Sequence, residues 1–265
     1  MSNAAAFFDL DKTIIAKSST LAFGRSLYKA GFLKRGMLVK AGIAQIAYTA
    51  FGADHNQLDK VKEQLSAVTM GWDAEELRQL AIEAMDEVVS PLVYQEAIEL
   101  IGHHRESGRK VVIISTSPEE IVAPLASYLG GIDHVIATRS EVGSDGKYTG
   151  ELEFYAYAEN KAIALREYAE ENDLDLSACF AYSDSVTDLP MMRAVGNPVA
   201  VNPDKELETA ALAAGWEIRI FEKPISMGDR LAVYKKPAEI SGAALGLGAI
   251  VLWFLNRRRK RNRAV

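Results

Sequence analysis

Two carboxylates spaced two residues apart, Asp9 and Asp11, directly follow an apolar run that ends at Phe8. An apolar run of this length is typical of a buried strand in a parallel sheet. Open α/β sheets bind their ligands at the carboxyl ends of such strands, so acids at this place are candidates for chemistry. Asp-x-Asp pairs are common by chance, and this pair becomes informative only together with polar residues further along the chain.

Three further polar clusters occur in order. Ser115 and Thr116 come after the apolar run 110–114, Lys161 lies near the start of the expected helix 158–171, and Asp184 and Asp188 come after the apolar run 178–182. Each has an ordinary structural explanation on its own, as a helix cap or as a solvated helix side chain. Independent motifs seldom all fall at strand ends and helix starts, so we expect these side chains to meet at one site.

Alternating strands and helices must position these residues. Apolar runs predict strands at 110–114, 134–137, 178–182, 198–201 and 216–221, and helical patterns lie at 91–107, 118–129, 158–171 and 204–214. A Ser-Asp-Gly-Lys turn at 144–147 predicts a hairpin leading into 148–150. This alternation is typical of a parallel sheet with helices on both faces.

Residues 20–88 read as an all-helical insertion. A helix begins at Ser18 or Ser19 and ends near Ala30, and amphipathic patterns predict helices at 56–69 and 73–89. The stretch 37–51 is apolar nearly all round. It fits a buried helix of a small bundle, and it also fits a helix that contacts lipid or an apolar substrate.

Composition and charge narrow the class of protein. The 265 residues are 49% hydrophobic and carry a single cysteine, Cys179, in an apolar run that predicts a buried core side chain. The last nine residues hold six basic and no acidic side chains, which leaves 24 basic against 36 acidic side chains in residues 1–256. An acidic body of this kind argues against binding to nucleic acid.

The basic tail comes after an uncharged stretch, 240–255, that ends against the arginine cluster. As a helix this stretch would be ~24 Å long, against a hydrocarbon core of ~30 Å. We expect residues 240–263 to attach the protein to the cytoplasmic face of a membrane, either as a short anchor or as a helix lying in the interface with its basic end on anionic headgroups.

The ordered clusters resemble the motifs of the haloacid dehalogenase (HAD) superfamily, subfamily IB, in its phosphoserine-phosphatase-like branch. The segment 9–13 (Asp-Leu-Asp-Lys-Thr), Ser115, Lys161 and the segment 183–188 match the four family motifs, and 145–150 resembles the hairpin between the second and third. The resemblance implies a doubly wound, Rossmann-like parallel sheet. Its core would comprise 1–19 and 89–222, with a helical cap at 20–88, a linker at 223–238, a C-terminal hydrophobic helix at 239–256 and the basic tail at 257–265.

The resemblance also implies roles. Asp9 would be the nucleophile that forms an aspartyl-phosphate, and Asp11 the general acid and then base. Lys161 would place positive charge on the nucleophile and the phosphate. A dehalogenase would have no use for Asp11.

A cation and anion-binding groups complete the implied site. Mg²⁺ would bind the carboxylates of Asp9 and Asp184 and the backbone carbonyl of Asp11. Ser115, Thr116 and nearby backbone N–H groups would hold phosphate oxygens. Asp188 would orient Lys161 or water on the metal.

Departures from the branch bear on the substrate. Ser18 stands where phosphoserine phosphatases carry an acid that reads the substrate's ammonium group, so phosphoserine is not favoured. Lys12 replaces a small residue, and Thr116 replaces a glycine. The cap residues Arg25, Lys29 and Arg78 are candidates for reading a further anionic group, although solvated side chains explain them equally well.

We therefore expect a membrane-tethered, Mg²⁺-dependent phosphomonoester hydrolase, acting on a lipid or lysolipid phosphate. Two alternatives stay open: a phosphatase of a small soluble amino-alcohol, amino acid or sugar phosphate, and a catalytically silent, membrane-anchored binding module. The intact Asp9, Asp11, Lys161 and Asp184 speak against the silent module.

Overall fold

The computed structural model describes residues 3–33, 68–222 and 224. The expected apolar helix 37–51, most of the helix 56–69, and the linker, hydrophobic helix and basic tail expected after 222 lie outside these residues, Pro224 apart. The described residues all belong to one structural unit, Met1–Met227. None of the helices within them combines the length and apolar character needed to cross a bilayer.

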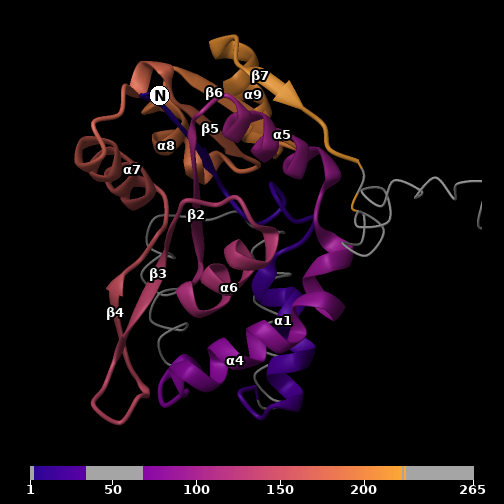
Figure 1. Ribbon diagram of the computed structural model, residues 1–265, viewed down its shortest axis with the longest axis vertical. Helices are drawn as coiled ribbons and strands as arrows, with labels where there is room; N and C mark the ends of the chain where they lie inside the picture. The colour runs from indigo at the N-terminus through magenta and orange to yellow at the C-terminus, as the bar shows by residue number, and fades with distance from the viewer. Residues whose placement is uncertain (1–2, 34–67, 223, 225–265) are drawn as a thin grey trace, which may run out of the picture. The chain divides into compact units, whose positions relative to one another are not determined.

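The strands of this part form a single sheet (Figure 1). They are β1 (Ala5–Phe8), β2 (Lys110–Pro118), β3 (His134–Val142), β4 (Tyr148–Phe154), β5 (Phe180–Ser183), β6 (Asn197–Val201) and β7 (Glu217–Arg219). Their order is β4-β3-β2-β1-β5-β6-β7, and every neighbouring pair is parallel except the antiparallel hairpin of β3 and β4. The expected parallel-dominated α/β sheet is thus confirmed.

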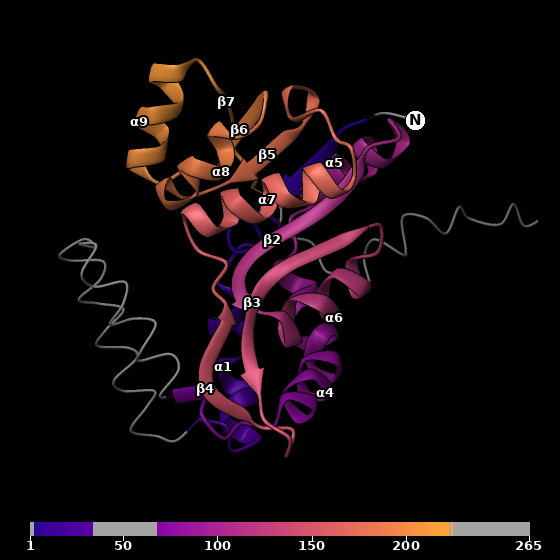
Figure 2. The ribbon, with the colours of Figure 1, turned by 90° about the vertical axis from the view of Figure 1, so that its left-hand side faces the viewer.

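Seven α-helices occur in the described ranges: α1 (Ser19–Lys29), α4 (Ala74–Ala84), α5 (Gln95–Glu106), α6 (Glu119–Leu129), α7 (Glu159–Glu171), α8 (Leu189–Arg193) and α9 (Lys205–Ala214). The helices α7, α8 and α9 contact one another or the strands β5 to β7 (Figure 2). The helices α1 and α4 pack against each other away from that group, and α4 also contacts α6.

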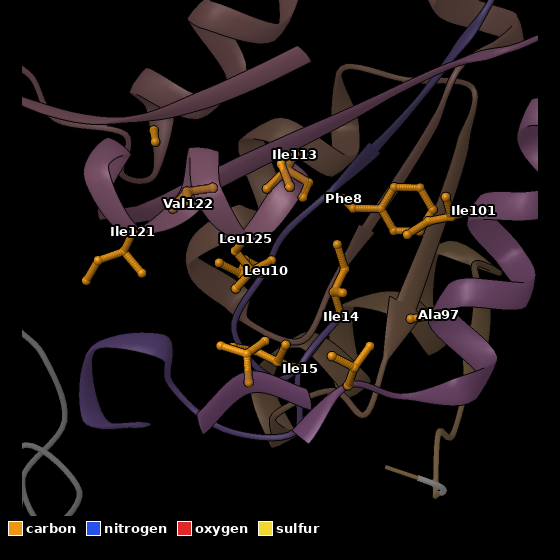
Figure 3. Packing of buried hydrophobic residues seen from close by; sticks show 14 of the residues in the cluster. Phe8, Leu10, Ile14, Ile15, Ala97, Ile101, Ile113, Ile121, Val122 and Leu125 are labelled. Atoms are coloured by element: carbon orange, nitrogen blue, oxygen red, sulfur yellow. The ribbon is translucent and has the colours of Figure 1, made fainter. Parts of the chain in front are cut away.

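The alternating direction of side chains along the central strands explains why helices cover both faces of the sheet. Successive side chains of a strand point to opposite faces, so an apolar strand with no polar positions must be buried on both sides. Phe8 of β1 and Ile113 of β2 belong to a core with α5, α6 and the cap helices (Figure 3). Phe7 and Val112, one residue away in each strand, belong to a second core with α7, α8 and α9. Cys179 is buried in this second core, as its sequence environment predicts.

The chain turns sharply where β1 ends. The backbone N–H groups of Ile14 and Ile15 donate to the carbonyl of Leu10, at 2.9 and 3.1 Å, and Lys12 takes a positive φ of 60°. Leu10, Ile14 and Ile15 are fully buried in the first core (Figure 3). This buried loop holds the acids at positions 9 and 11 in place.

The described cap helices bury one face each. In α1 the buried residues Ser19, Phe23 and Leu27 recur every four positions, as expected for one face of a helix. In α4 the side chain of Asp73 accepts a hydrogen bond from the N–H of Glu76 and so caps the start of the helix. The chain then continues through a π-helical turn, Met85–Val89, and a 3₁₀ turn, Ser90–Leu92.

Two sets of boundaries expected from the sequence are wrong. The helix expected to start at Pro91 begins at Gln95, because Val93 pairs with Ile15 and the N–H of Tyr94 donates to the carbonyl of Ile14 at 2.9 Å. The strands β2 and β3 are longer than their apolar runs: β2 continues through polar residues to Pro118, and β3 continues into the hairpin with β4. Tertiary pairing, which local polarity does not reveal, extends both strands.

Candidate active site

Sheet topology brings three of the polar clusters to one edge. β1 lies between β2 and β5, and Phe8 is in register with Ile113 of β2 and Tyr182 of β5. Asp9, Ser115 and Asp184 therefore lie at nearly the same level at the carboxyl ends of three neighbouring strands. From β1 the chain continues to β2 and β3 on one side of the sheet, and later strands β5 to β7 add on the other side. Open α/β sheets bind their ligands at the strand ends where the strand order reverses in this way.

A cavity of about 980 Å³ opens at this edge. The seven residues to which the family motifs give a catalytic, phosphate-binding or metal-binding role all line it: Asp9, Asp11, Ser115, Thr116, Lys161, Asp184 and Asp188. The remaining walls come from the turn after β1, from α1 and from the residues around the π-helical turn. The convergence of these side chains on one cavity, on which the enzyme interpretation depends, is thus present.

Lys161 lies at the centre of a buried ion-pair network. Its Nζ is 2.7 Å from Oδ1 of Asp9 and 2.8 Å from Oδ2 of Asp188, which also accepts a hydrogen bond from the hydroxyl of Ser183 at 2.7 Å. Burial alone would lower the pKa of Lys161, but the charges of Asp188 and Asp9 outweigh it and raise the pKa above its ordinary value. Lys161 is a charged ammonium group in contact with the first acid.

Burial dominates the electrostatics of Asp9 and Asp184. Burial raises the pKa of Asp9 to about 8, with Lys161 opposing the rise and Asp188, Asp184 and Asp11 adding to it. Burial likewise raises the pKa of Asp184 to about 6, against the lowering effect of Lys12. Both groups lack enough positive charge nearby to hold them fully ionised.

Asp11 is held by groups that the sequence patterns did not reveal. The N–H of Ser19, the first residue of α1, donates to its Oδ1 at 2.8 Å, and the hydroxyl of Ser117 donates to its Oδ2 at 3.4 Å. The hydroxyls of Ser19 and Ser117 are 2.6 Å apart. Burial raises the pKa of Asp11 although the hydrogen bonds from Ser19 lower it. The raised pKa keeps more of this carboxyl protonated, as a proton donor must be, and the hydrogen bonds from Ser19 make the proton easier to release.

The sequence offered a partial signal for these missed serines. Ser19 opens an expected helix, and Ser117 lies two residues after Ser115. That the two side chains meet depends only on the contact between α1 and the end of β2. Asp9 also receives a hydrogen bond from its own loop, since the hydroxyl of Thr13 donates to Oδ2 of Asp9 at 3.4 Å.

Ser115 and Thr116 differ in what they offer a ligand. Ser115 is buried, and its hydroxyl accepts from the N–H of Ser117 at 3.2 Å. It does not cap a helix, because α6 begins four residues later at Glu119. The hydroxyl of Thr116 donates to the carbonyl of Ala156 at 2.9 Å, so this proton is already engaged.

Lys12 points back to the site. Its Nζ is 3.3 Å from Oδ2 of Asp184, although its side chain is 64% exposed. The charge of Asp184 raises the pKa of Lys12. A non-glycine residue at positive φ is uncommon, and here it directs an ammonium group toward a buried acid.

The donor set fits a hard cation. Four acids, Asp9, Asp11, Asp184 and Asp188, face only two lysines in this part of the cavity. No cluster of three or more acidic, histidine or cysteine side chains in the described residues forms a metal site by itself. The donors implied by the resemblance are two carboxylates and a backbone carbonyl. Such oxygen ligands, with water, are what Mg²⁺ prefers.

The cap residues Ser18, Arg25 and Lys29 also line the cavity, whereas Arg78 is exposed on α4 outside it. Ser18 is the N-cap residue of α1, but its side chain makes no capping hydrogen bond.

Fold and cavity together define an α/β enzyme with paired acids and a lysine at the carboxyl end of its central strand. The chain belongs to the haloacid dehalogenase-like hydrolase family, whose family model matches residues 6–193.

Relatives that match most of the chain include named phosphatases. The chain is 46% identical to the "Inhibition of morphological differentiation protein" of Streptomyces azureus, over 96% of this chain and 94% of that protein. It is 34% identical to the phosphoserine phosphatase SerB1 of Mycobacterium tuberculosis, over 93% and 77%, and 33% identical to a histidinol-phosphatase of Neisseria meningitidis, over 82% and 98%. A crystal structure of a protein of unknown function from Bordetella pertussis superposes with a TM-score of 0.71 at 26% identity, over 83% of this chain and 99% of that one. The identification of the chain as a phosphatase of this family is thereby confirmed.

Proposed function

We propose that this chain is a Mg²⁺-dependent phosphomonoesterase that works through an aspartyl-phosphate. The observation that carries the proposal is the convergence of Asp9, Asp11, Ser115, Lys161 and Asp184 on one cavity. Phosphoryl transfer needs a nucleophile in line, neutralisation of oxygen charge and a proton for the leaving oxygen. Each need has a candidate among these residues.

In the first step a carboxylate oxygen of Asp9 attacks phosphorus, the bond to the ester oxygen breaks, and Asp11 gives that oxygen its proton. Lys161, 2.7 Å from Asp9, opposes the rise in the pKa of the nucleophile that burial causes, and it offsets charge on the transferring group. In the second step water attacks the aspartyl-phosphate, Asp11 takes a proton from it, and phosphate leaves with Asp9 restored.

Two further sets of groups hold the phosphate. The hydroxyl of Ser115 lies at the cavity wall to donate to a phosphate oxygen. The carboxylates of Asp9 and Asp184 and the carbonyl of Asp11 would hold Mg²⁺, which would supply positive charge against the phosphate oxygens. Asp188 positions Lys161 through their 2.8 Å contact.

The test uses the full-length chain and p-nitrophenyl phosphate. Wild type should hydrolyse it with Mg²⁺, and EDTA should stop the reaction until Mg²⁺ is restored. Asp9→Asn should lose at least about a thousandfold in kcat, because it removes the nucleophile. Asp173→Asn, an exposed aspartate outside the cavity, is the matched control and should keep wild-type activity. Equal activity in the two variants would contradict the proposal, and a wild-type chain inactive with Mg²⁺ would favour the silent binding module.

Two observations favour different substrate classes. The names of the phosphoserine phosphatase and the histidinol-phosphatase specify small phosphate esters, which supports a small soluble metabolite. The uncharged stretch and basic tail at 240–263, outside the described residues, support attachment to a membrane and a lipid or lysolipid phosphate. A panel that pairs soluble phosphates with lysolipid and lipid phosphates in vesicles separates them: activity confined to one half of the panel removes the other class.

A further inference from the structure

One face of α1 lines the same cavity as the catalytic acids. Leu21, Arg25 and Lys29 recur every four residues, so they lie one above another along the helix. They are about 120–160° round the helix from its buried residues Phe23 and Leu27. All three are exposed, and all three line the cavity. The helix thus buries one face in the core and turns a cationic face toward the place where a leaving group would lie.

The two cations of this face have no acidic partner in the part of the chain that the structure describes. The ion pairs found there involve neither Arg25 nor Lys29. Like charges four residues apart on a helix repel each other. Lys17, which precedes α1, also lines the cavity, and among the described residues Glu87 is the one acid lining it outside the catalytic cluster. An anion placed between Arg25 and Lys29 would relieve that repulsion.

Charge is therefore separated along the cavity. The catalytic end holds Asp9, Asp11, Asp184 and Asp188 against two lysines, and the cap end holds more cations than acids. Leu21, which precedes Arg25 on α1 and is 65% exposed, adds apolar surface to the cavity together with Val88 and Leu92. These surfaces fit a molecule with an anionic group at each end and an apolar part between them.

The start of α1 fixes the distance scale. The N–H of Ser19 contacts the carboxylate of Asp11, so the helix begins at the proton donor. At a rise of 1.5 Å per residue, Arg25 lies about 9 Å and Lys29 about 15 Å further along the helix axis. A second anionic group on the leaving group must therefore lie within about 9–15 Å of the start of α1. The distance it must span is shorter by the reach of the Arg25 and Lys29 side chains.

We propose that Arg25 and Lys29 bind a second anionic group, a carboxylate or phosphate, on the leaving-group side of the phosphate ester. The inference rests on the proposed function and names the substrate class of the same cavity. It makes Arg25 and Lys29 specificity-determining residues, with Leu21 contacting the linker between the two anionic groups.

The experiment compares two matched series of substrates with the full-length enzyme and Mg²⁺. One series carries a carboxylate at the far end of an alkyl phosphate of increasing chain length. The other carries a carboxamide, which has nearly the same shape and no charge. Wild type should prefer the carboxylate by about tenfold to a hundredfold in kcat/KM, as one charge-assisted contact would give, with an optimum at one chain length.

Variants connect that preference to the helix face. The double variant Arg25→Gln/Lys29→Gln should lose the preference, so that its kcat/KM for each carboxylate falls to about that for the matching carboxamide. Arg78→Gln removes a cap arginine outside the cavity and should keep the full preference. A terminal phosphonate in place of the carboxylate should be preferred in the same way if a second phosphate is the natural group.

The outcomes are distinct. No preference for the carboxylate at any chain length, or a preference that survives in the double variant, overturns the inference while hydrolysis of p-nitrophenyl phosphate leaves the proposed function standing. Loss of the preference in Arg78→Gln as well as in the double variant would also overturn it, since the effect would then come from overall charge and not from this face. No hydrolysis of any substrate by wild type refutes the proposed function itself.

Discussion

At the scale of single residues, Lys12 stands out because its ammonium group contacts an acid implied as a metal ligand. The 3.3 Å contact between Lys12 and Asp184 places a monovalent cation beside the donor that Mg²⁺ would use. The same contact is made by a residue held at a φ of 60°. Lys12 is therefore a competitor for the charge of Asp184.

Removing that charge should strengthen metal binding. We expect Lys12→Gln to bind Mg²⁺ several-fold more tightly than wild type, because the metal no longer displaces an ammonium group from Asp184. Calorimetric titration of the metal into full-length protein without substrate measures the dissociation constant directly. Lys17→Gln also removes a cavity lysine, but one without an ion pair in the described residues, and should change the constant little. Weaker Mg²⁺ binding by Lys12→Gln would show instead that Lys12 supports the site.

Sequence patterns predicted most of the candidate site, and the reason is topological. Asp9, Ser115 and Asp184 all come directly at or after apolar strands, so parallel neighbours were expected to bring them together. Ser19 and Ser117 were missed because their contact with Asp11 depends on how the cap helix meets the core, and no local pattern encodes that approach. The catalytic roles of all these residues stay predictions.

At the scale of elements, α5 is tied to the sheet through a buried histidine. Arg109 lies 3.2 Å from Nδ1 of His104, and Nε2 of the same ring is 2.8 Å from the hydroxyl of Tyr182. A neutral ring satisfies both contacts by accepting at Nδ1 and donating from Nε2. Burial, reinforced by the charge of Arg109, lowers the pKa of His104 from 6.5 to about 4.

This depressed pKa predicts a pH dependence of stability. Between pH 6.5 and 4 the unfolded chain binds a proton at His104 that the folded chain does not, so folding is favoured above that window and loses about 2–3 kcal/mol as pH falls through it. Urea unfolding at pH 7 and at pH 4.5 measures the loss. His104→Gln should show a smaller loss than wild type, and His103→Gln, which changes the exposed neighbour, should match wild type. Identical losses in all three proteins would refute the assignment to His104.

Two glycines test packing at element boundaries. A Cβ at Gly196, before β6, would lie 1.9 Å from the backbone carbonyl oxygen of Ser177, which cannot move without disturbing the turn before β5. Gly196→Ala should lower the free energy of unfolding by about 1–3 kcal/mol. Gly102 lies within α5 with open space around it, and Gly102→Ala should raise that free energy by up to about 1 kcal/mol. Urea unfolding of both variants at one pH is the measurement, and a stable Gly196→Ala protein would contradict the packing found here.

The element boundaries show where local patterns stop being informative. The strands β1 and β5 and the helices α1, α6, α7 and α9 match apolar runs and helical periodicity closely. The start of α5 and the ends of β2 and β3 do not match, because they depend on pairing with other segments. Val93 pairs with Ile15 in the loop after β1, and pairing with β4 extends β3. Local sequence patterns do not reveal such pairing, because it depends on which segments the tertiary fold brings together.

At the scale of the whole molecule, negative charge is in excess over residues 1–256, and the basic residues at 257–263 follow as a separate segment. We predict that the full-length chain sediments with vesicles that contain anionic lipid, and that a chain ending at residue 239 does not. Replacing Arg257, Arg258 and Arg259 with Gln should weaken binding and its dependence on salt, because the apolar stretch then acts alone. Equal sedimentation of the full and shortened chains would exclude the terminal residues as the point of attachment.

The hydrogen bond between Ser19 and Asp11 connects the helix proposed to bind the leaving group with the proposed proton donor. This bond lowers the proton affinity of the acid, so a tilt of α1 that lengthened it would make Asp11 a weaker acid. The same helix carries Arg25 and Lys29 at its far end. If Arg25 and Lys29 bind the substrate as proposed, we expect a ligand that contacts both to hold the start of the helix against Asp11, and a ligand that contacts neither to leave this hydrogen bond longer. We therefore expect a substrate that fits poorly against Arg25 and Lys29 to undergo slower proton transfer at Asp11, at the other end of the same helix.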